Sequence, residues 1–170
     1  MIKVCIISGG MITNSAHIPA YRKFSDDFYI SAVSDINETA AKETAERHGI
    51  PGYYKDAREM LEKEKPDLVS VCVPNCFHKE YTLMALNCGA NVICEKPLAV
   101  RYKDAVEMFD LAKNKGKLLM ACQSMRFTPD RLAAKEYIDK NGLGKIYYGE
   151  FARVRRRGIP YWGTFHMKKI

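Results

Sequence analysis

Short apolar runs alternate with helix-type segments over the first 122 residues, and this alternation restricts the fold more than any other feature. The runs are continuously apolar, which is typical of parallel strands buried on both faces. They cover residues 2–8, 29–34, 53–54, 68–73, 92–94 and 118–122. The helix-type segments between them cover residues 15–24, 38–48, 56–63, 78–88 and 102–115. The sequence therefore predicts an α/β fold with a doubly wound parallel sheet.

Residues that favour helix ends lie at the boundaries of these segments. Asn37 precedes the second helix as a good N-cap, and Gly49 follows it. Asp56 and Glu59 have the spacing of a capping box, in which each side chain bonds the other residue's backbone N–H. These local signals agree with the boundaries that the apolar pattern indicates.

The pattern changes after Gln123. Thr128 and Pro129 favour the start of a helix that runs to about residue 141. Residues 145–154 alternate as an antiparallel strand with one wet face would. We therefore expect two domains, a dinucleotide-binding domain over 1–124 and the truncated beginning of a second α/β domain over 125–170.

Polar residues follow each predicted strand directly. Because the carboxyl ends of parallel strands meet at one edge, these residues should gather where open α/β sheets bind ligands. They are Ser8 to Thr13, Asp35, Pro74 with Asn75, Glu95 with Lys96, and Gln123.

The loop after the first strand resembles a dinucleotide fingerprint in placement more than in sequence. Ser8, Gly10 and Thr13 occupy its three glycine positions, so only the middle glycine is present. The backbone N–H groups at the start of the next helix, around Met11 and Ile12, still favour phosphate. We expect Gly10 to tolerate change least. A plain strand–turn–helix corner is the alternative.

Asp35 ends the second strand a little more than 20 residues after this loop. An acid at that position accepts hydrogen bonds from the adenosine ribose and repels a 2′-phosphate, which favours NAD over NADP. A turn or capping role is the alternative. Asn75 can bond a ribose or a nicotinamide amide, and His78 either joins that site or only starts the next helix.

Lys96 follows an apolar strand and precedes Pro97, which ends the strand because it lacks an N–H. A lysine in a partly closed pocket beside a cofactor can exchange a proton and polarise a hydroxyl or carbonyl. Glu95 can hold it in position. An isolated Glu-Lys-Pro is more often a surface loop, so the other strand ends carry the interpretation.

The net charge of +7 raises the question of a nucleic-acid partner. Much of the basic excess lies late in the chain, and no recognised nucleic-acid-binding motif is present. We therefore predict no nucleic-acid partner. These late basic residues are Arg153, Arg155, Arg156, Arg157, Lys168 and Lys169.

The cysteines and histidines lack the spacing of a metal site, so we predict no metal. Cys5, Cys72, Cys94 and Cys122 lie in apolar runs and are interpreted as reduced, buried thiols. No apolar run approaches the roughly 20 residues that cross a bilayer. We expect a cytoplasmic protein without a membrane partner.

Four segments together resemble the Gfo/Idh/MocA family of NAD(P)-dependent oxidoreductases. They are Ser8 to Asn14 leading to His17-Ile18-Pro19-Ala20, Val73-Pro74-Asn75 with His78, Glu95-Lys96-Pro97, and Arg126-Phe127-Thr128-Pro129. The resemblance implies a Rossmann first domain and an α/β second domain through which members form oligomers. It also implies hydride transfer between nicotinamide and a sugar or polyol hydroxyl or carbonyl.

The resemblance also assigns roles to residues. Lys96 would be the catalytic lysine and would touch the substrate. Arg126 and Trp162 would approach substrate or cofactor. The cofactor contacts would be Ser8, Gly10, Met11, Ile12, Asp35, Pro74, Asn75, His78, Glu95 and Gln123.

Two departures from the family pattern leave an alternative open. Ser8 and Thr13 replace glycine or alanine, and the chain ends before the D-x-G-x-H motif that supplies the family's acid/base histidine. His166 lacks that context. A non-catalytic dinucleotide sensor is the alternative function, and a truncated enzyme is expected to be weakly active alone.

Overall fold

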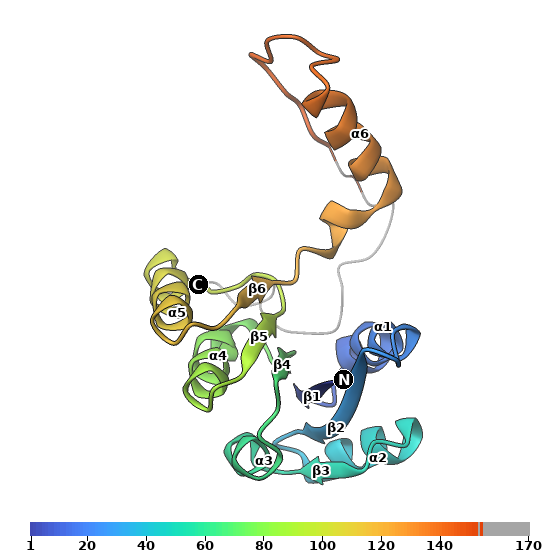
Figure 1. Cartoon of the computed structure of the whole chain (residues 1–170), viewed down its shortest axis with the longest axis vertical. Coiled ribbons are helices and arrows are strands. Elements are labelled where there is room, and N and C mark those ends of the chain that lie inside the picture. The colour runs from blue at the N-terminus through green and yellow to red at the C-terminus, as the bar shows by residue number, and fades with distance from the viewer. Residues whose placement is uncertain (153, 155–170) are drawn as a thin grey trace. The chain divides into compact units, whose positions relative to one another are not determined.

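The computed structural model describes residues 1–152 and 154, and the chain divides into two compact units, Met1–Cys122 and Gln123–Ile170. The first unit contains a single six-stranded parallel sheet in the order β3-β2-β1-β4-β5-β6 (Figure 1). This order is that of the Rossmann fold and confirms the predicted fold class. The strands are β1 (Ile2–Ile7), β2 (Phe28–Ser34), β3 (Gly52–Tyr54), β4 (Leu68–Val71), β5 (Asn91–Cys94) and β6 (Leu119–Ala121).

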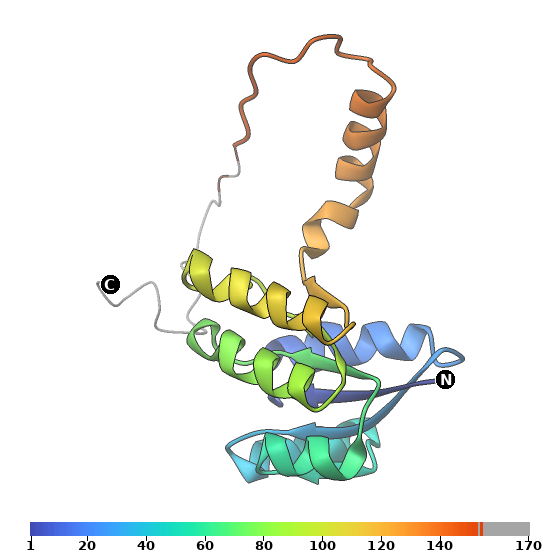
Figure 2. The same ribbon diagram turned by 60° about the vertical axis from the view of Figure 1, so that its left-hand side comes forward.

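Helices cover both faces of the sheet (Figures 1 and 2). Two of them, α1 (Ile18–Lys23) and α2 (Glu38–His48), pack on one face. The other face carries α3 (Ala57–Glu64), α4 (His78–Asn87) and α5 (Tyr102–Asn114). This two-sided cover is the reason why the strands are continuously apolar.

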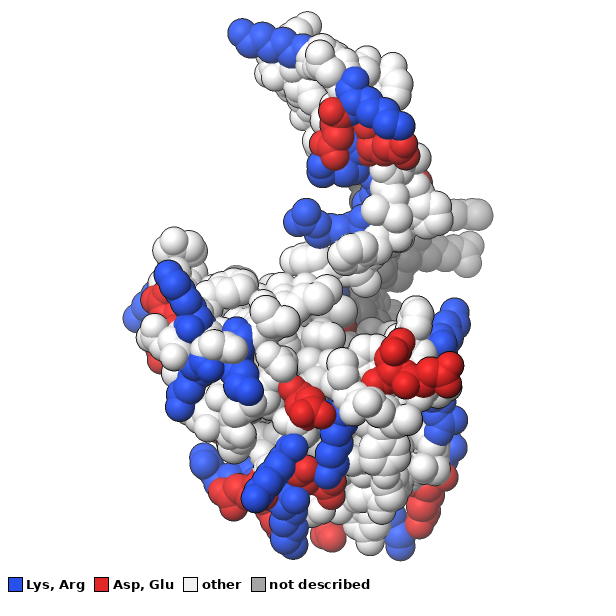
Figure 3. All heavy atoms as spheres, in the orientation of Figure 1, with Lys and Arg blue, Asp and Glu red and all other residues white. Residues whose placement is uncertain are grey.

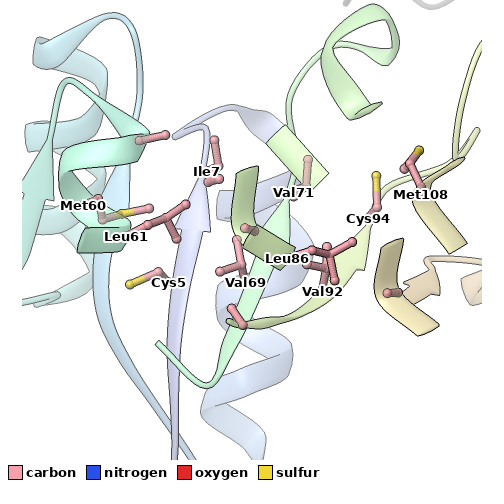
Figure 4. Close-up of a cluster of buried hydrophobic side chains, with 14 of the residues drawn as sticks. Cys5, Ile7, Met60, Leu61, Val69, Val71, Leu86, Val92, Cys94 and Met108 are labelled. Carbon is pink, nitrogen blue, oxygen red and sulfur yellow. The ribbon is translucent and has the colours of Figure 1, made fainter. Parts of the chain in front are cut away.

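Successive residues of β1 illustrate the two cores. Val4 and Ile6 belong to the cluster under α1 and α2, whereas Cys5 and Ile7 belong to the cluster under α3, α4 and α5. Figure 4 shows the second cluster, where Leu61 of α3 and Leu86 of α4 lie over β1, β4 and β5. Burial of both faces of β1 fixes the position of its carboxyl end, where the polar residues follow.

The predicted helix caps are partly correct. The Asn37 side chain accepts a hydrogen bond from Thr39 N at 3.2 Å, and Gly49 ends α2 in the left-handed region with φ of 56°. Asp56 accepts from Glu59 N at 2.9 Å, but the Glu59 carboxylate bonds Lys63 Nζ at 2.7 Å. The capping box is therefore only half formed.

The first helix departs most from the prediction. A continuous helical segment covers residues 11–23, whereas residues 15–24 were expected. It contains a π-helical turn, Thr13–His17, ahead of α1. A π-helical turn adds a residue and changes which side chains face the sheet. This turn has a direct effect at the candidate site, because it buries both Thr13 and His17.

In the second unit, α6 (Pro129–Asp139) begins after Thr128, where the sequence predicted it. None of its side chains is buried. Residues 145–152 form no strand, although residues 145–154 were expected to. A strand needs a neighbour for its backbone hydrogen bonds, and the described residues of this unit offer none. Trp162 and His166 lie outside the described residues.

Charged side chains of both signs are interspersed on the visible face of the first unit (Figure 3). That face shows no basic stripe. The late basic residues from Arg153 onward lie outside the described residues. The absence of a nucleic-acid partner remains a prediction. Among the described helices, none combines the length and apolar character needed to cross a membrane.

Candidate functional site

The strand ends lie side by side at one edge of the sheet. Ile7 is a register partner of both Ser34 and Val71, and Cys94 is a register partner of Val71 and Ala121. The next residue of each strand in the first unit therefore lies at the same level, which brings Ser8, Asp35 and Glu95 to one edge. Gln123 and Arg126 belong to the second unit.

A hydrogen-bond network around Asp35 shapes the loop after β1. Asp35 Oδ2 accepts from Gly9 N at 2.9 Å and from Ser8 Oγ at 3.3 Å. Ser8 Oγ in turn accepts from Gly10 N at 3.3 Å. Ser8 adopts φ of 89°, a region that glycine tolerates best. The serine at the first glycine position thus keeps a glycine-like backbone, and its hydroxyl links the loop to Asp35.

Side chains of the π-helical turn fix the loop carbonyls. Thr13 Oγ1 donates to Ser8 O at 2.6 Å. Asn14 Nδ2 donates to Gly9 O at 2.7 Å and to Gly10 O at 2.9 Å. Thr13, which replaces the third glycine, is fully buried. Polar side chains therefore stabilise a loop that the fingerprint builds from glycines.

Gly9, and not Gly10, is the glycine that the fold requires. A Cβ at Gly9 would lie 2.9 Å from both the Ala40 carbonyl oxygen and Thr44 Oγ1 of α2. A Cβ at Gly10 would meet only Ser8 Oγ, at 3.3 Å. For the folded chain, the expectation that Gly10 tolerates change least is therefore wrong, since α2 packs against Gly9.

We expect Gly9→Ala to lower the free energy of unfolding by about 1–3 kcal/mol, the usual effect of overpacking a close contact. Gly10→Ala, the matched control, should change it by less than about 1 kcal/mol. Urea unfolding followed by circular dichroism measures both values. Equal losses in the two variants would show that contact with α2 does not constrain the loop.

Two clefts adjoin this loop. One, of about 370 Å³, lies at the carboxyl ends of β1, β2 and β4 and is lined by Ser8, Asp35, Lys55 and Pro74, among others. The other, of about 510 Å³, lies against α2 and is lined by Gly9, Gly10 and Met11. Ile12 is half-buried and packs against the core under α1.

His78 follows the loop after β4, and its side chain is buried beneath that loop. Its ring is 1% exposed. Nδ1 lies 2.7 Å from Pro97 O and Nε2 lies 2.9 Å from Val73 O. A neutral ring has one N–H, so it donates to one of these two carbonyls while the other ring nitrogen lies against the second. The ring thus packs between the segments that carry Asn75 and Lys96. The expectation that His78 contacts a cofactor is revised, because its ring faces inward to two carbonyls.

Lys96 lies at the surface next to a buried acid. Its side chain is exposed and its peptide bond to Pro97 is cis. Glu95 is 9% exposed, and its Oε2 accepts a hydrogen bond from Lys96 N at 3.1 Å. Its Oε1 lies 3.0 Å from Nε2 of His17. The Glu95 carboxylate is therefore directed into the protein.

Hydrogen bonds keep the Glu95 carboxylate ionised. Burial alone would raise its pKa, but hydrogen bonds from His17, the Lys96 N–H and the Cys122 thiol lower the pKa below its usual value overall. Ligand atoms of His17, Glu95 and Cys122 lie within 4.8 Å of one another. The three groups are also joined by hydrogen bonds at the Glu95 carboxylate. The absence of a metal stays a prediction.

Sequence reasoning missed the partners of Glu95. His17 contacts it from 78 positions away, and neither residue type nor local spacing indicates such a pairing. Lys55, which lines the cleft, was also missed, because the strand before it is too short to mark its end clearly in the sequence. The only available signal was the placement of His17 within the segment that resembles the family.

Comparisons with known proteins agree with this geometry. The family described as "Oxidoreductase family, NAD-binding Rossmann fold" matches residues 2–123. D-glucoside 3-dehydrogenase of Escherichia coli K12 is 38% identical over 99% of this chain and 48% of its own length. An NADP(+)-specified scyllo-inositol 2-dehydrogenase of Bacillus subtilis is 30% identical over 78% of this chain and 40% of its own length.

A solved structure gives the same result. The WlbA dehydrogenase of Chromobacterium violaceum, in complex with NADH and UDP-GlcNAcA, has a TM-score of 0.81 at 28% identity. The match covers 86% of this chain and 42% of that chain. The chain thus spans about half the length of the curated relatives it matches. The sheet order, the loop after β1 and these matches show that the chain belongs to the Gfo/Idh/MocA family of oxidoreductases with an NAD-binding Rossmann fold.

Proposed function

We propose that this protein is an NAD(P)-dependent oxidoreductase that transfers hydride between nicotinamide and a hydroxyl or carbonyl of a sugar or polyol. The observation that carries the proposal is the 370 Å³ cleft at the carboxyl ends of β1, β2 and β4, where Ser8 and Asp35 meet. Open α/β sheets bind ligands at this edge. The relatives named are dehydrogenases, which does not favour a non-catalytic sensor.

The residues at this edge fit a dinucleotide. Gly10 leaves space above the loop, since a side chain there would meet only Ser8 Oγ. The helical segment 11–23 begins at Met11, and its first N–H groups have no partner within the helix, which suits a pyrophosphate. Pro74 lines the same cleft, and Asn75 begins the short helix after it. We assign these residues to the cofactor.

Lys96 is the residue we assign to the chemistry. A bound nicotinamide would supply hydride exchange at the substrate carbon. The exposed Lys96 ammonium would hold the substrate oxygen and exchange its proton. Glu95 would act by fixing the Lys96 backbone, since its carboxylate accepts from Lys96 N–H and is otherwise directed inward. This differs from a direct contact between the Glu95 side chain and the cofactor.

The substrate class comes from the relatives, which include dehydrogenases of a glucoside and an inositol. We propose that residues 1–124 form the dinucleotide domain and that residues 125–170 begin a domain for substrate binding and self-association. Gln123 would lie near nicotinamide, and Arg126 and Trp162 are substrate candidates.

Asp35 is the group that we propose selects NAD over NADP. Its Oδ1 accepts from Asn37 N at 2.9 Å and its Oδ2 from Gly9 N, which leaves further acceptor positions for ribose hydroxyls. Lys55 lines the same cleft and would attract a 2′-phosphate. We propose that repulsion of a 2′-phosphate by the Asp35 carboxylate outweighs attraction by Lys55, because these bonds fix Asp35 next to the loop.

We expect Asp35→Asn to weaken NADH binding about 10- to 100-fold, since one charge-assisted hydrogen bond contributes about 1.5–3 kcal/mol. NADPH binding should weaken much less, because repulsion of the 2′-phosphate is removed. Nicotinamide fluorescence titration measures both affinities. Asp26→Asn, near the opposite end of β2, is the control and should leave both unchanged. An unchanged NADH affinity in Asp35→Asn would contradict the assigned role.

A cytoplasmic location is also proposed. Among the described residues all six cysteines are free thiols, and Cys5, Cys72 and Cys94 are buried in the sheet region. Unpaired cysteines are typical of a reducing compartment. Labelling of intact thiols in cell extracts made under alkylating conditions would test this location.

A further inference from the structure

A buried chain of polar side chains runs from the helical segment after the loop to the backbone of Lys96. His17, 8% exposed, ends the π-helical turn, and its Nε2 lies 3.0 Å from Glu95 Oε1. The second oxygen of the same carboxylate accepts from Lys96 N at 3.1 Å. One carboxylate therefore joins His17 to the residue assigned to the reaction.

The other side of the His17 ring is also fixed. Nδ1 lies 3.3 Å from Ser70 Oγ, and Ser70 Oγ lies 2.7 Å from the Tyr21 hydroxyl. Ser70 is fully buried on β4, in the middle of the sheet. A consistent assignment has Tyr21 donating to Ser70, Ser70 to Nδ1, and Nε2–H to Glu95. The imidazole thus has little freedom to turn away from the carboxylate.

His17 shares its helical segment with the loop that we assign to the pyrophosphate. Residues 11–23 are continuously helical, and Thr13 and Asn14 of that segment bond the carbonyls of Ser8, Gly9 and Gly10. A hydrogen-bonded helix moves as a unit, so a change at its start reaches His17. The π-helical turn is the reason why His17 faces the sheet within this segment.

We propose that His17 is a positioning residue that, through Glu95, holds Lys96 in a fixed position relative to the dinucleotide loop. Contact between His17 and the reacting atoms is not required. The proposal rests on the proposed function, because it assumes that NADH binds at the loop and that its nicotinamide covers Lys96. It predicts that breaking the link leaves binding by the adenosine half in place and uncouples the Lys96 segment from bound cofactor.

The experiment measures acetylation of Lys96 by sulfo-N-hydroxysuccinimide acetate with and without saturating NADH, using the whole 170-residue chain and mass spectrometry. In the wild type, NADH should slow acetylation by about tenfold or more. In His17→Leu the ratio should fall below about threefold, although fluorescence still reports NADH binding. His17→Gln keeps an N–H donor and should restore most of the protection.

Two further variants separate positioning from general damage. Tyr21→Phe removes the hydroxyl that bonds Ser70 and leaves His17 and Glu95 in contact, so it should lower stability without changing the protection ratio. Glu95→Leu removes both carboxylate oxygens, so neither the His17 ring nor the Lys96 N–H keeps its partner. It should reproduce the loss seen in His17→Leu, and it provides the test if that variant does not fold.

The outcomes distinguish this inference from the proposed function. The proposed function, and this inference with it, would be overturned if the wild-type chain did not bind NADH. The same holds if NADH did not protect Lys96 of the wild type from acetylation. Full protection in folded His17→Leu or Glu95→Leu, with normal protection in the wild type, would overturn this inference alone.

Discussion

Replacing Lys96 with methionine is expected to lower turnover by about 10²- to 10⁴-fold, the range typical for loss of a general acid or base. NADH affinity should change by less than about threefold, because the clefts that adjoin the loop are lined by other residues. Methionine keeps most of the length of the unbranched side chain and removes the ammonium group. The result would separate catalysis from binding at a single side chain.

The chain spans about half the length of its relatives, so we propose to measure turnover in a chimera that has the full length of a relative. The chimera joins residues 1–123 to the remaining half of the E. coli D-glucoside 3-dehydrogenase and allows D-glucosides as assay substrates. Lys103→Met, an exposed lysine on α5, is the matched control and should retain full activity. Robust turnover by the Lys96→Met chimera would refute the assigned role.

His78→Leu is expected to have a large effect on stability, a loss of about 2–3 kcal/mol in the free energy of unfolding. Leucine fills a similar volume but leaves whichever carbonyl accepts the ring N–H, that of Val73 or that of Pro97, without its donor. Each buried unsatisfied polar group costs about 1–3 kcal/mol. Thermal unfolding followed by circular dichroism measures the loss.

His48→Leu is the control for a histidine that makes a single side-chain bond. His48 is partly exposed, and its Nε2 lies 2.9 Å from Asn14 Oδ1. We expect it to cost less than about 1.5 kcal/mol. Similar losses for the two variants would mean that the link between Val73 and Pro97 adds little to a simple hydrogen bond.

The sequence predicted the sheet well because burial on both faces leaves a signal in every strand. Val4 and Ile6 face one core and Cys5 and Ile7 the other, so the run is apolar throughout. The strands β3 and β6 are short, but each could be placed because it follows a helix in the alternating pattern of strands and helices. β6 is one residue shorter at each end than expected, since Leu118 and Cys122 bond β5 without belonging to the ladder. β3 begins one residue earlier than expected, at Gly52.

The arrangement within the site could not be predicted in the same way. The pairing of His17 with Glu95 depends on a π-helical turn, and the sequence of that turn fits an ordinary helix equally well. The need for glycine at position 9 depends on how closely α2 approaches the loop. The inward orientation of His78 follows from two backbone carbonyls that carry no sequence signal. Tertiary contacts decide all three.

The bonds that hold Asp35 also bear on the entropy of ligand recognition. Its two oxygens are held by the backbone N–H groups of Asn37 and Gly9, so the carboxylate is oriented in the chain without a ligand. A side chain that must be immobilised on binding costs about 0.5–1.5 kcal/mol. Asp35 has already lost that freedom during folding. On the role proposed for Asp35, selectivity for the ribose would come from a pre-organised receptor group, and most of the ordering cost would fall on the ligand.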